Sequence, residues 1–351
     1  MSKNSNEKYK DKGLTGLANL GNTCFINSCM QILSHTYELN NFLDKGEFRE
    51  KLNEKPESLL LVEWDKLRKL MWSENCTISP AGWVQTVQKI AKKKKRDLFT
   101  GFAQNDLPEF LLFIIDSFHS SLMREVEMNI KGVVKNETDK LAKSCYEMMK
   151  KMYKNEYSEI LNIFYGIHVS QITSLDGTEI KSYSPEPYFM IDLAIDFNDK
   201  NQISLYDCFD NYYNPEMLTG ENGWYNEKTK QKEDIAKSIV FWSLPDILVI
   251  SLKRFNNFNR KNQKLVTFPL DNLDLRKYAK GYEKESYIYD LYGICNHSGG
   301  SMGGHYTSFV KNANENWYLF NDTSIVEIKN NIESNLISSK AYCFFYKKKN
   351  L

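Results

Sequence analysis

The spacing of apolar residues changes once along the chain, close to Gly166, and this change limits the folds that the chain can adopt. Before Gly166, apolar residues recur every three to four positions, which is typical of amphipathic helices. After it, short runs with period two are separated by turn residues, which is typical of strands. These runs cover 166–173, 188–195, 239–242, 246–253, 287–294, 305–311, 317–320, 325–328 and 341–347. Helices followed by strands predict an α+β fold in two layers.

The first part of the chain carries clear signals for the starts of helices. Asn22 and Thr23 are suitable N-caps for a helix with an apolar face. Asp106 is followed three residues later by Glu109, the pattern of a capping box, so a second helix should begin there. The segment 125–165 continues the helical pattern with many charges.

Composition excludes several classes of protein. The 351 residues include 46 Lys and Arg against 45 Asp and Glu, so the net charge is +1 and no nucleic-acid partner is expected. Apolar residues make up 42%, which excludes a disordered polymer. No apolar run approaches the roughly 20 residues of a membrane span, and residues 1–13 lack the apolar core of a signal peptide. We therefore expect a cytoplasmic protein without a membrane partner, with residues 1–13 as a disordered polar tail.

The basic run Lys92–Arg96 has two interpretations. It fits a solvated loop, because runs of like charge are usually exposed. The alternative is a nuclear address, which would place the protein in the nucleus as well.

The seven cysteines are widely spaced, and none forms a CxxC pair. A tetracysteine zinc site and a disulfide framework are therefore not expected. Cys24 stands out because it follows Gly21-Asn22-Thr23 where a loop enters a helix. A helix N-terminus should lower the pKa of this thiol and make it a nucleophile, although a packed cysteine fits the same position.

Two further motifs supply partners for a nucleophilic thiol. His305 follows four glycines within residues 299–304 and begins a predicted strand, where it could act as a general base. Asn321 and Asp322 follow the next strand, and an antiparallel hairpin would bring them beside His305. Either side chain could hold the imidazole in one tautomer, and an Asn-Asp turn fits the same residues.

These motifs, taken together and in this order, closely resemble the ubiquitin-specific proteases, the papain-like cysteine deubiquitinases. The resemblance runs from about residue 14 to 347. The matching residues are Gly16, Leu17, Asn19, Gly21, Asn22, Thr23, Cys24, Phe25, Asn27, Ser28 and Gln31; Gln104, Asp106, Glu109, Phe110 and Leu111; Leu244, Pro245, Leu248 and Leu252 to Phe255; Gly304, His305 and Tyr306; and Trp317, Phe320, Asn321 and Asp322.

The resemblance implies a fold and a set of catalytic roles. The catalytic domain would cover 14–347, with a helical thumb over about 14–165, a palm and β-sheet fingers over about 166–347, and a short basic tail at 348–351. The catalytic residues that it implies are Cys24 as nucleophile, His305 as general base, Asn321 as the orienting residue, Asn19 as the oxyanion-hole amide and Asp322 as a candidate auxiliary. The reaction would be hydrolysis of the bond after the last glycine of ubiquitin.

The resemblance also implies a substrate channel. The candidate substrate-binding residues are Gln104, Asp106, His297, Gly303, Gly304 and Tyr306. Asp106 has two interpretations: a helix N-cap, or an acidic partner for the arginines of ubiquitin's Leu-Arg-Leu-Arg-Gly-Gly end. The segments 256–264 and 298–304 resemble the two loops that border the channel in the family.

One departure from the family pattern concerns metal. Most members carry two CxxC pairs at the fingertips, but the matching stretches here are Ser174–Gly177 and Asn226–Thr229, which lack cysteine. We therefore expect no metal and no cofactor. Ubiquitin or a ubiquitinated protein is the expected partner of a monomer, and the alternatives are an inactive ubiquitin-binding scaffold and a protease for a ubiquitin-like modifier.

Overall fold

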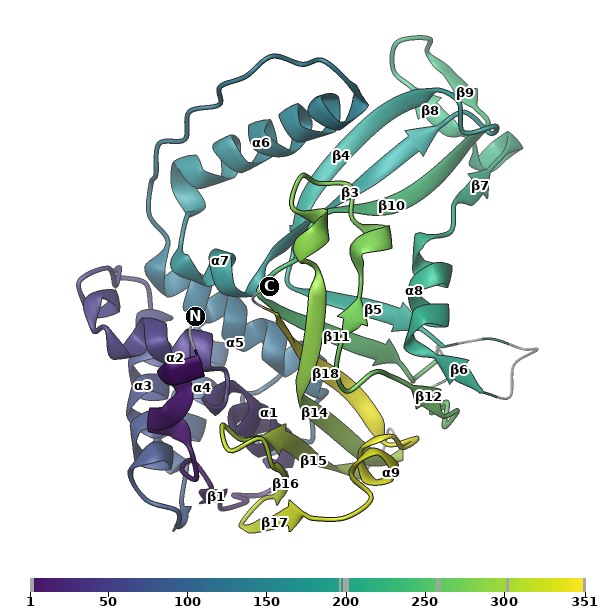
Figure 1. Cartoon of the computed structure of the whole chain (residues 1–351). Helices are drawn as coiled ribbons and strands as arrows, with labels where there is room; N and C mark the ends of the chain where they lie inside the picture. The colour runs from purple at the N-terminus through teal and green to yellow at the C-terminus, as the bar shows by residue number, and fades with distance from the viewer. Residues whose placement is uncertain are drawn as a thin grey trace.

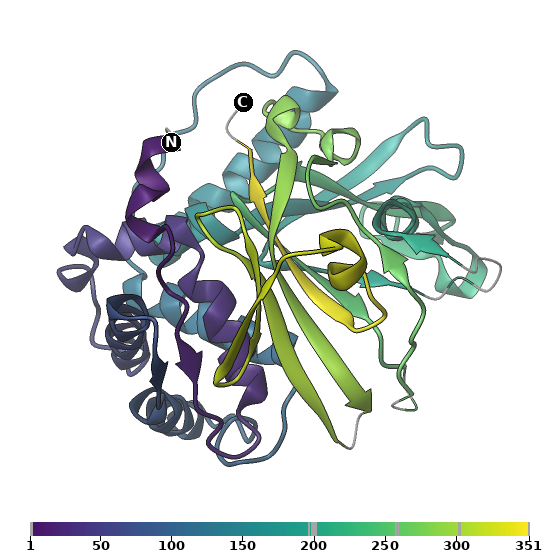
Figure 2. The same ribbon diagram turned by 60° about the horizontal axis from the view of Figure 1, so that its bottom comes forward.

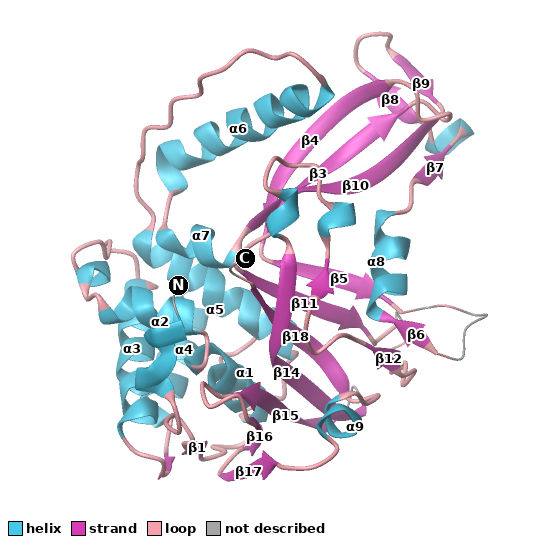
Figure 3. Ribbon diagram, viewed as in Figure 1, coloured by secondary structure: helices cyan, strands magenta, loops and turns pink. Residues whose placement is uncertain are grey.

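The computed structural model describes residues 3–195, 197, 202–256, 258, 260–300 and 303–349. Figure 1 shows helices from the first half of the chain packed beside a large sheet from the second half, with a smaller sheet projecting from it. Figure 3 shows the same separation of helices from strands by colour. The α+β prediction is confirmed.

The helices near the N-terminus form one bundle. Their bounds are α1 (Cys24–Ser34), α2 (Tyr37–Asp44), α3 (Ser58–Ser73), α4 (Ala81–Lys93), α5 (Leu107–Leu122) and α7 (Glu159–Phe164). Every residue of α1 is buried, because α1 lies between the other helices and the large sheet. No helix in the described ranges has the length and apolar character that crossing a membrane requires.

The large sheet lies beside α1. Its strands are β17 (Ser324–Ile328), β16 (Trp317–Asn321), β15 (Gly303–Lys311), β14 (Ile288–Gly300), β18 (Ala341–Lys348), β11 (Ile247–Lys253) and β5 (Met190–Ala194) in spatial order, with β13 (Leu273–Asp274) on β14. Neighbours are antiparallel except β11 and β5. Gly293 on β14 has no side chain where Ile32 of α1 approaches, and a Cβ there would lie 2.8 Å from the Ile32 Cγ2. This glycine allows α1 to pack closely against the sheet.

The smaller sheet has the order β4-β3-β10-β7 among the described residues. Its strands are β3 (Gly166–Thr173), β4 (Ile180–Tyr188), β10 (Ile235–Ser243) and β7 (Glu216–Leu218). α6 (Glu137–Glu156) packs on this sheet and buries Leu141 and Cys145 against Val169, Val240 and Trp242. α6 therefore belongs with the smaller sheet, although it precedes the change of pattern at Gly166.

The remaining elements are short. They are β1 (Gly16–Leu17), β2 (Thr77–Ile78), β6 (Ile203–Ser204), β8 (Trp224–Asn226), β9 (Gln231–Glu233), β12 (Val266–Thr267), α8 (Leu205–Tyr213), α9 (Ile332–Leu336) and the 3-10 turns η1 (Lys3–Tyr9), η2 (Glu47–Arg49), η3 (Gly220–Asn222), η4 (Arg276–Tyr278) and η5 (Lys284–Ser286). β1 pairs with β2 directly before α1 and so fixes the chain that leads to Cys24.

The structure corrects two expectations about the chain ends. The described part of residues 1–13 is ordered: it forms η1, and the Tyr9 ring stacks on Tyr37 with centroids 4.5 Å apart. An aromatic ring with only 4% exposure stabilises a segment whose other residues are polar. Lys348 is the last residue of β18 and pairs with Asp246 at 2.6 Å rather than belonging to a tail. Residues 1, 2, 350 and 351 lie outside the described residues.

Two further expectations about the helical part are corrected. The run Lys92–Arg96 is not a loop throughout, because Lys92 and Lys93 form the last turn of α4, where positive charge complements the helix dipole. Lys94 pairs with Glu57 at 3.0 Å and with Asp116 at 3.1 Å. The helical pattern of 125–165 starts only at Glu137, after the N-cap Asn136, whose side chain accepts from the N–H of Asp139.

Candidate active site

Cys24 is the first residue of α1 and is 2% exposed. The loop before it is held by the side chain of Asn19, whose Oδ1 accepts hydrogen bonds from the backbone N–H groups of Gly21 and Thr23, each at 3.1 Å. Gly21 and Asn22 both have positive φ, at 98° and 53°. Glycine and asparagine tolerate this conformation best, which explains why these residue types precede the cysteine.

His305 and Asn321 lie together on neighbouring antiparallel strands, β15 and β16. The His305 Nε2 and the Asn321 Oδ1 are 2.6 Å apart. Because a carboxamide oxygen only accepts, Nε2 carries the proton of the neutral ring and Nδ1 keeps its lone pair. This arrangement leaves His305 with a free basic nitrogen.

Cys24 lies against the strand that carries His305. The backbone N–H of Tyr306, the residue after His305, donates to the Cys24 sulfur. α1 packs on β15 (Figure 2), and both elements contribute to the same hydrophobic core. The structure therefore brings the thiol of Cys24 into the neighbourhood of His305 and Asn321.

The backbone N–H groups of Cys24 and Phe25 at the start of α1 lower the pKa of the Cys24 thiol as expected, but the pKa is raised overall. Burial raises the pKa of the thiol, and the negative charge of Asp322 raises it further, while the N–H of Tyr306 lowers it only in part. Burial away from water disfavours the thiolate more strongly than the helix N-terminus favours it. A thiolate here therefore needs a nearby cation.

Asp322 joins the sheet to the loop before Cys24. It occupies the turn between β16 and β17 with φ at 51°. Its carboxylate accepts from the Asn19 Nδ2 at 2.9 Å and from the Asn27 Nδ2 at 2.8 Å, and its backbone oxygen accepts from the Leu17 N–H at 2.9 Å. An amide nitrogen carries two hydrogens, so the bond to Asp322 leaves Asn19 with a second one to donate.

Asn27 is a functional candidate to which the sequence motifs assign no role of its own. Its side chain is 2% exposed and lies on the buried face of α1. Ser28, Gln31 and Ser34 of α1 are buried as well, and buried polar side chains usually have a hydrogen-bond partner, so the polar residues within this helix were a signal available in the sequence.

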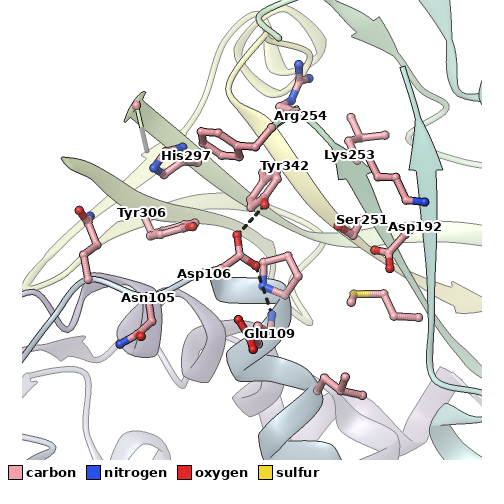
Figure 4. Close-up of a pocket in the computed structure, with 17 residues that line it drawn as sticks. Asn105, Asp106, Glu109, Asp192, Ser251, Lys253, Arg254, His297, Tyr306 and Tyr342 are labelled. Atoms are coloured by element: carbon pink, nitrogen blue, oxygen red, sulfur yellow. Dashed lines mark hydrogen bonds between the residues drawn. The ribbon is translucent and has the colours of Figure 1, made fainter. Parts of the chain in front are cut away.

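A pocket of about 600 Å³ is lined by the segment 104–106 and by residues of β5, β11 and β14 (Figure 4). Three carboxylates line it: Asp106 and Glu109 from the start of α5, and Asp192 from β5. Burial raises the pKa of Asp192. The sequence alone does not reveal Asp192 as a pocket residue, because it lies in a strand about 85 residues beyond Asp106 and only the fold brings the two together.

Asp106 is the N-cap of α5, as the sequence predicts. Its Oδ1 accepts from the Glu109 N–H at 3.2 Å, and its Oδ2 accepts from the Tyr342 hydroxyl at 2.6 Å. Figure 4 shows both bonds at the floor of the pocket. Burial raises the pKa of Asp106. The capping role and a position on the pocket wall are therefore compatible.

Gln104 lines the pocket and is paired with Gly304, the residue before His305. The Gln104 side chain pairs with the Gly304 backbone twice: its Oε1 accepts from the Gly304 N–H at 2.9 Å, and its Nε2 donates to the Gly304 oxygen. Residue 304 must be glycine, because a Cβ there would overlap the His297 ring. Gly303 is exposed and has open space around it.

His297 lies in an aromatic cage in the pocket wall. Its ring centroid is 4.6 Å from that of Tyr306, 5.6 Å from Phe255 and 6.0 Å from Tyr342. Burial and the nearby Lys261 lower the pKa of His297 to about 4, so the ring is neutral. Lys261 donates to the His297 backbone oxygen at 2.5 Å and so links the segment 256–264 to β14, directly before the segment 298–304. Residues 257, 259, 301 and 302 of these segments lie outside the described residues.

An ion pair lies beside the fingertip stretches. Glu233 of β9 pairs with Lys181 of β4 at 2.6 Å and accepts from the Asn226 Nδ2 at 2.6 Å. Within the described ranges, no group of three or more His, Cys, Asp or Glu residues is arranged to hold a metal ion.

Comparisons with known proteins agree with this geometry. The family described as ubiquitin carboxyl-terminal hydrolase matches residues 15–346. The chain is 31% identical to ubiquitin carboxyl-terminal hydrolase 2 of Bos taurus and 32% identical to that of Homo sapiens, in each case over 95% of this chain and 55% of the relative. The chain thus spans about half the length of these curated relatives.

Solved structures agree on the fold. The SAGA Ubp8/Sgf11/Sus1/Sgf73 DUB module bound to ubiquitin aldehyde matches with a TM-score of 0.71 at 24% identity, over 98% of this chain and 71% of that chain. The expected thumb, palm and fingers fold of the ubiquitin-specific proteases is therefore confirmed at the level of the fold.

Proposed function

Since this chain belongs to the ubiquitin carboxyl-terminal hydrolase family, we propose that it is a cysteine deubiquitinase that hydrolyses the isopeptide or peptide bond after the last glycine of ubiquitin. One observation carries the proposal. Cys24, the His305–Asn321 pair and the Asn19–Asp322 pair are held together by short contacts, and Tyr306, whose N–H donates to Cys24, also lines the pocket that contains the carboxylates.

Cys24, His305 and Asn19 have different roles in the first half of the reaction. The His305 Nδ1 takes the proton of the Cys24 thiol, and the imidazolium then supplies the cation that the buried thiolate needs. The thiolate attacks the carbonyl carbon of the last glycine, and the resulting oxyanion accepts from the second hydrogen of the Asn19 Nδ2. His305 then returns the proton to the leaving amine.

The second half of the reaction regenerates the enzyme. The acyl group of ubiquitin is now bound to Cys24 as a thioester. His305 takes a proton from a water molecule, whose oxygen attacks the thioester carbon, and the Cys24 thiol leaves with a proton from the imidazolium. Asn321 keeps the Nε2 proton in place throughout, so that Nδ1 is available in both halves.

The pocket fits the C-terminal end of ubiquitin. Asp106, Glu109 and Asp192 would face the arginines of Leu-Arg-Leu-Arg-Gly-Gly. The two glycines would then pass the Gln104–Gly304 pair toward Cys24, beside Gly303, His297 and Tyr306. A residue with a larger side chain would meet the same walls that require glycine at 304.

A ubiquitin derivative with a C-terminal electrophile tests the proposal. Cys24 should form a covalent adduct, and Cys24→Ser should abolish the adduct without changing the melting curve. Cys76 is an exposed cysteine and serves as an internal control. An adduct at Cys76 of equal yield, or no adduct at all, would contradict the assignment and favour an inactive scaffold. A panel of modifier-fluorophore substrates would distinguish ubiquitin from ubiquitin-like modifiers.

We also propose that the protein acts as a cytoplasmic monomer, with the nucleus as the alternative location, and that it uses no metal or cofactor. Light scattering would measure the oligomeric state, and a fluorescent fusion would show the compartment.

A further inference from the structure

Phe102 is a large aromatic side chain that is left exposed next to the loop of the nucleophile. Its exposed fraction is 62%. The ring lies 3.6 Å from the position that a Cβ on Gly21 would take, and the Phe102 oxygen accepts from the Asn22 Nδ2 at 2.9 Å. A single exposed apolar side chain is common on protein surfaces, so the position of this ring beside the loop that leads to Cys24, and not its exposure alone, points to a role in binding.

The backbone near Phe102 is held in a costly conformation. Phe99 has φ at 64°, which is unusual for an aromatic residue, yet its side chain is only 4% exposed. Its ring packs against Phe113 at 5.3 Å and against Phe110 at 5.4 Å. A buried anchor with strained backbone fixes the segment that presents Phe102, and strain of this kind is concentrated at functional sites.

Phe102 contacts the loop that leads to Cys24 and not the acidic pocket. It lies against Gly21 and Asn22 and is not among the residues that line the pocket. Gln104, two residues later, lines the pocket and is bound to Gly304. The segment 102–104 therefore passes from the loop of Cys24 to the pocket, and a peptide in the pocket would leave the Phe102 ring to the other half of the substrate.

We propose that Phe102 is a specificity residue for the leaving side of the scissile bond. This inference rests on the proposed function. The leaving group of an isopeptide is a lysine side chain, whose methylene stem is apolar along most of its length. The exposed ring would pack on this stem and on an apolar side chain next to the lysine in the modified protein.

Two substrates with the same acyl half and different leaving groups test the proposal. The first is ubiquitin ethyl ester, whose leaving group has two carbons. The second is ubiquitin joined to the lysine ε-amino group of a short labelled peptide that carries a leucine beside the lysine. Phe102→Ala should lower kcat/KM about tenfold for the peptide conjugate and less than twofold for the ester. Phe102→Leu should recover most of the loss.

Leu112→Ala is the matched control, because Leu112 is also apolar, is 46% exposed and lines the pocket of the acyl half. It should lower kcat/KM for both substrates by the same factor. Equal effects of Phe102→Ala on the two substrates, or no effect on either, would overturn the inference. If the unmodified protein cleaves neither substrate, the proposed function itself fails. Melting curves of both Phe102 variants should match that of the unmodified protein, since the side chain is exposed.

Discussion

Replacement of Asp322 by alanine should slow catalysis and at the same time make Cys24 more reactive toward a simple alkylating agent. The carboxylate has two separable effects on the site. It accepts from the Asn19 Nδ2 at 2.9 Å and so would orient the donor that we propose for the oxyanion. Its negative charge also raises the pKa of the Cys24 thiol, in addition to the larger effect of burial.

The size of the catalytic loss follows from the contacts. Loss of one oxyanion-hole donor costs about 10²–10³ in kcat, which sets the upper limit for a change that only misplaces Asn19. Hydrogen bonds to a charged group contribute about 1.5–3 kcal/mol, so an unheld Asn19 should spend most of its time in other orientations. We therefore expect Asp322→Ala to lower kcat by about 10–10³. KM should change little, because Asp322 does not line the pocket.

A double-mutant cycle with Asn19→Ala tests whether Asp322 affects kcat through Asn19. If Asp322 acts through Asn19, the double variant should be no slower than Asn19→Ala alone. If the losses in kcat of the two single variants multiply in the double variant, Asp322 acts independently of Asn19 and this reasoning is refuted.

The rate of alkylation by iodoacetamide as a function of pH gives the second readout. Removal of a negative charge favours the thiolate, so the apparent pKa of Cys24 should fall in Asp322→Ala and stay unchanged in Asn19→Ala. A higher apparent pKa of Cys24 in Asp322→Ala would show that the carboxylate favours the thiolate indirectly. This result would contradict the expectation that the charge of Asp322 raises the pKa of Cys24.

Three further predictions concern other parts of the chain. Asp106→Ala should cost about 1 kcal/mol of stability through the lost N-cap and should also raise KM. Tyr342→Phe removes only the 2.6 Å bond to Asp106 and should leave the cap intact. If Asp106→Ala lowers the melting temperature but leaves KM unchanged, Asp106 acts only as the N-cap. Elemental analysis should find no stoichiometric zinc, and a chelator should not change the melting curve. Glu233→Gln should lower the melting temperature by only about 1–3 °C, since the ion pair between Glu233 and Lys181 is partly exposed. Burial alone would raise the pKa of Glu159, but hydrogen bonds from Arg124, Lys51 and the backbone outweigh burial and hold the pKa at about 2 in the folded protein. The contribution of Glu159 to stability is therefore present above about pH 4.5 and is lost as the pH falls toward 2. Denaturant titrations of Glu159→Gln should show a weaker loss of stability over this range than those of the unmodified protein.

The sequence predicts three strands well because they are short runs rich in β-branched or aromatic residues between turn residues. β3 has the predicted bounds, and β11 and β16 differ from theirs by one residue at one end. β4 was not predicted, because its sequence IKSYSPEPY has few apolar residues and two prolines. It is a strand through its backbone bonds to β3, at the edge of the smaller sheet where proline is tolerated.

The candidate site also contains residues that the sequence predicts and residues that it does not. Its motif residues are predictable because they occur in compact, ordered groups around Cys24 and His305. Tyr342 was missed because it lies in an apolar strand, AYCFFYKK, where a tyrosine fits the pattern without a special role. Its bond to Asp106 spans 236 residues of sequence, and only the pairing of β18 with β14 places it at the pocket.

Cys24 and the strand that carries His305 share one hydrophobic core, and this explains how a candidate site divided between two parts of the fold keeps its geometry. Cys24 and Phe25 of α1 pack in the same cluster as Tyr306 of β15 and Phe320 of β16. α6 and the smaller sheet bury their apolar residues in a separate cluster. A close-packed interior resists relative movement of the elements that it joins, whereas two clusters can shift against each other at lower cost. Movement of the smaller sheet upon binding would then change how the substrate is gripped without changing the position of Cys24 relative to His305.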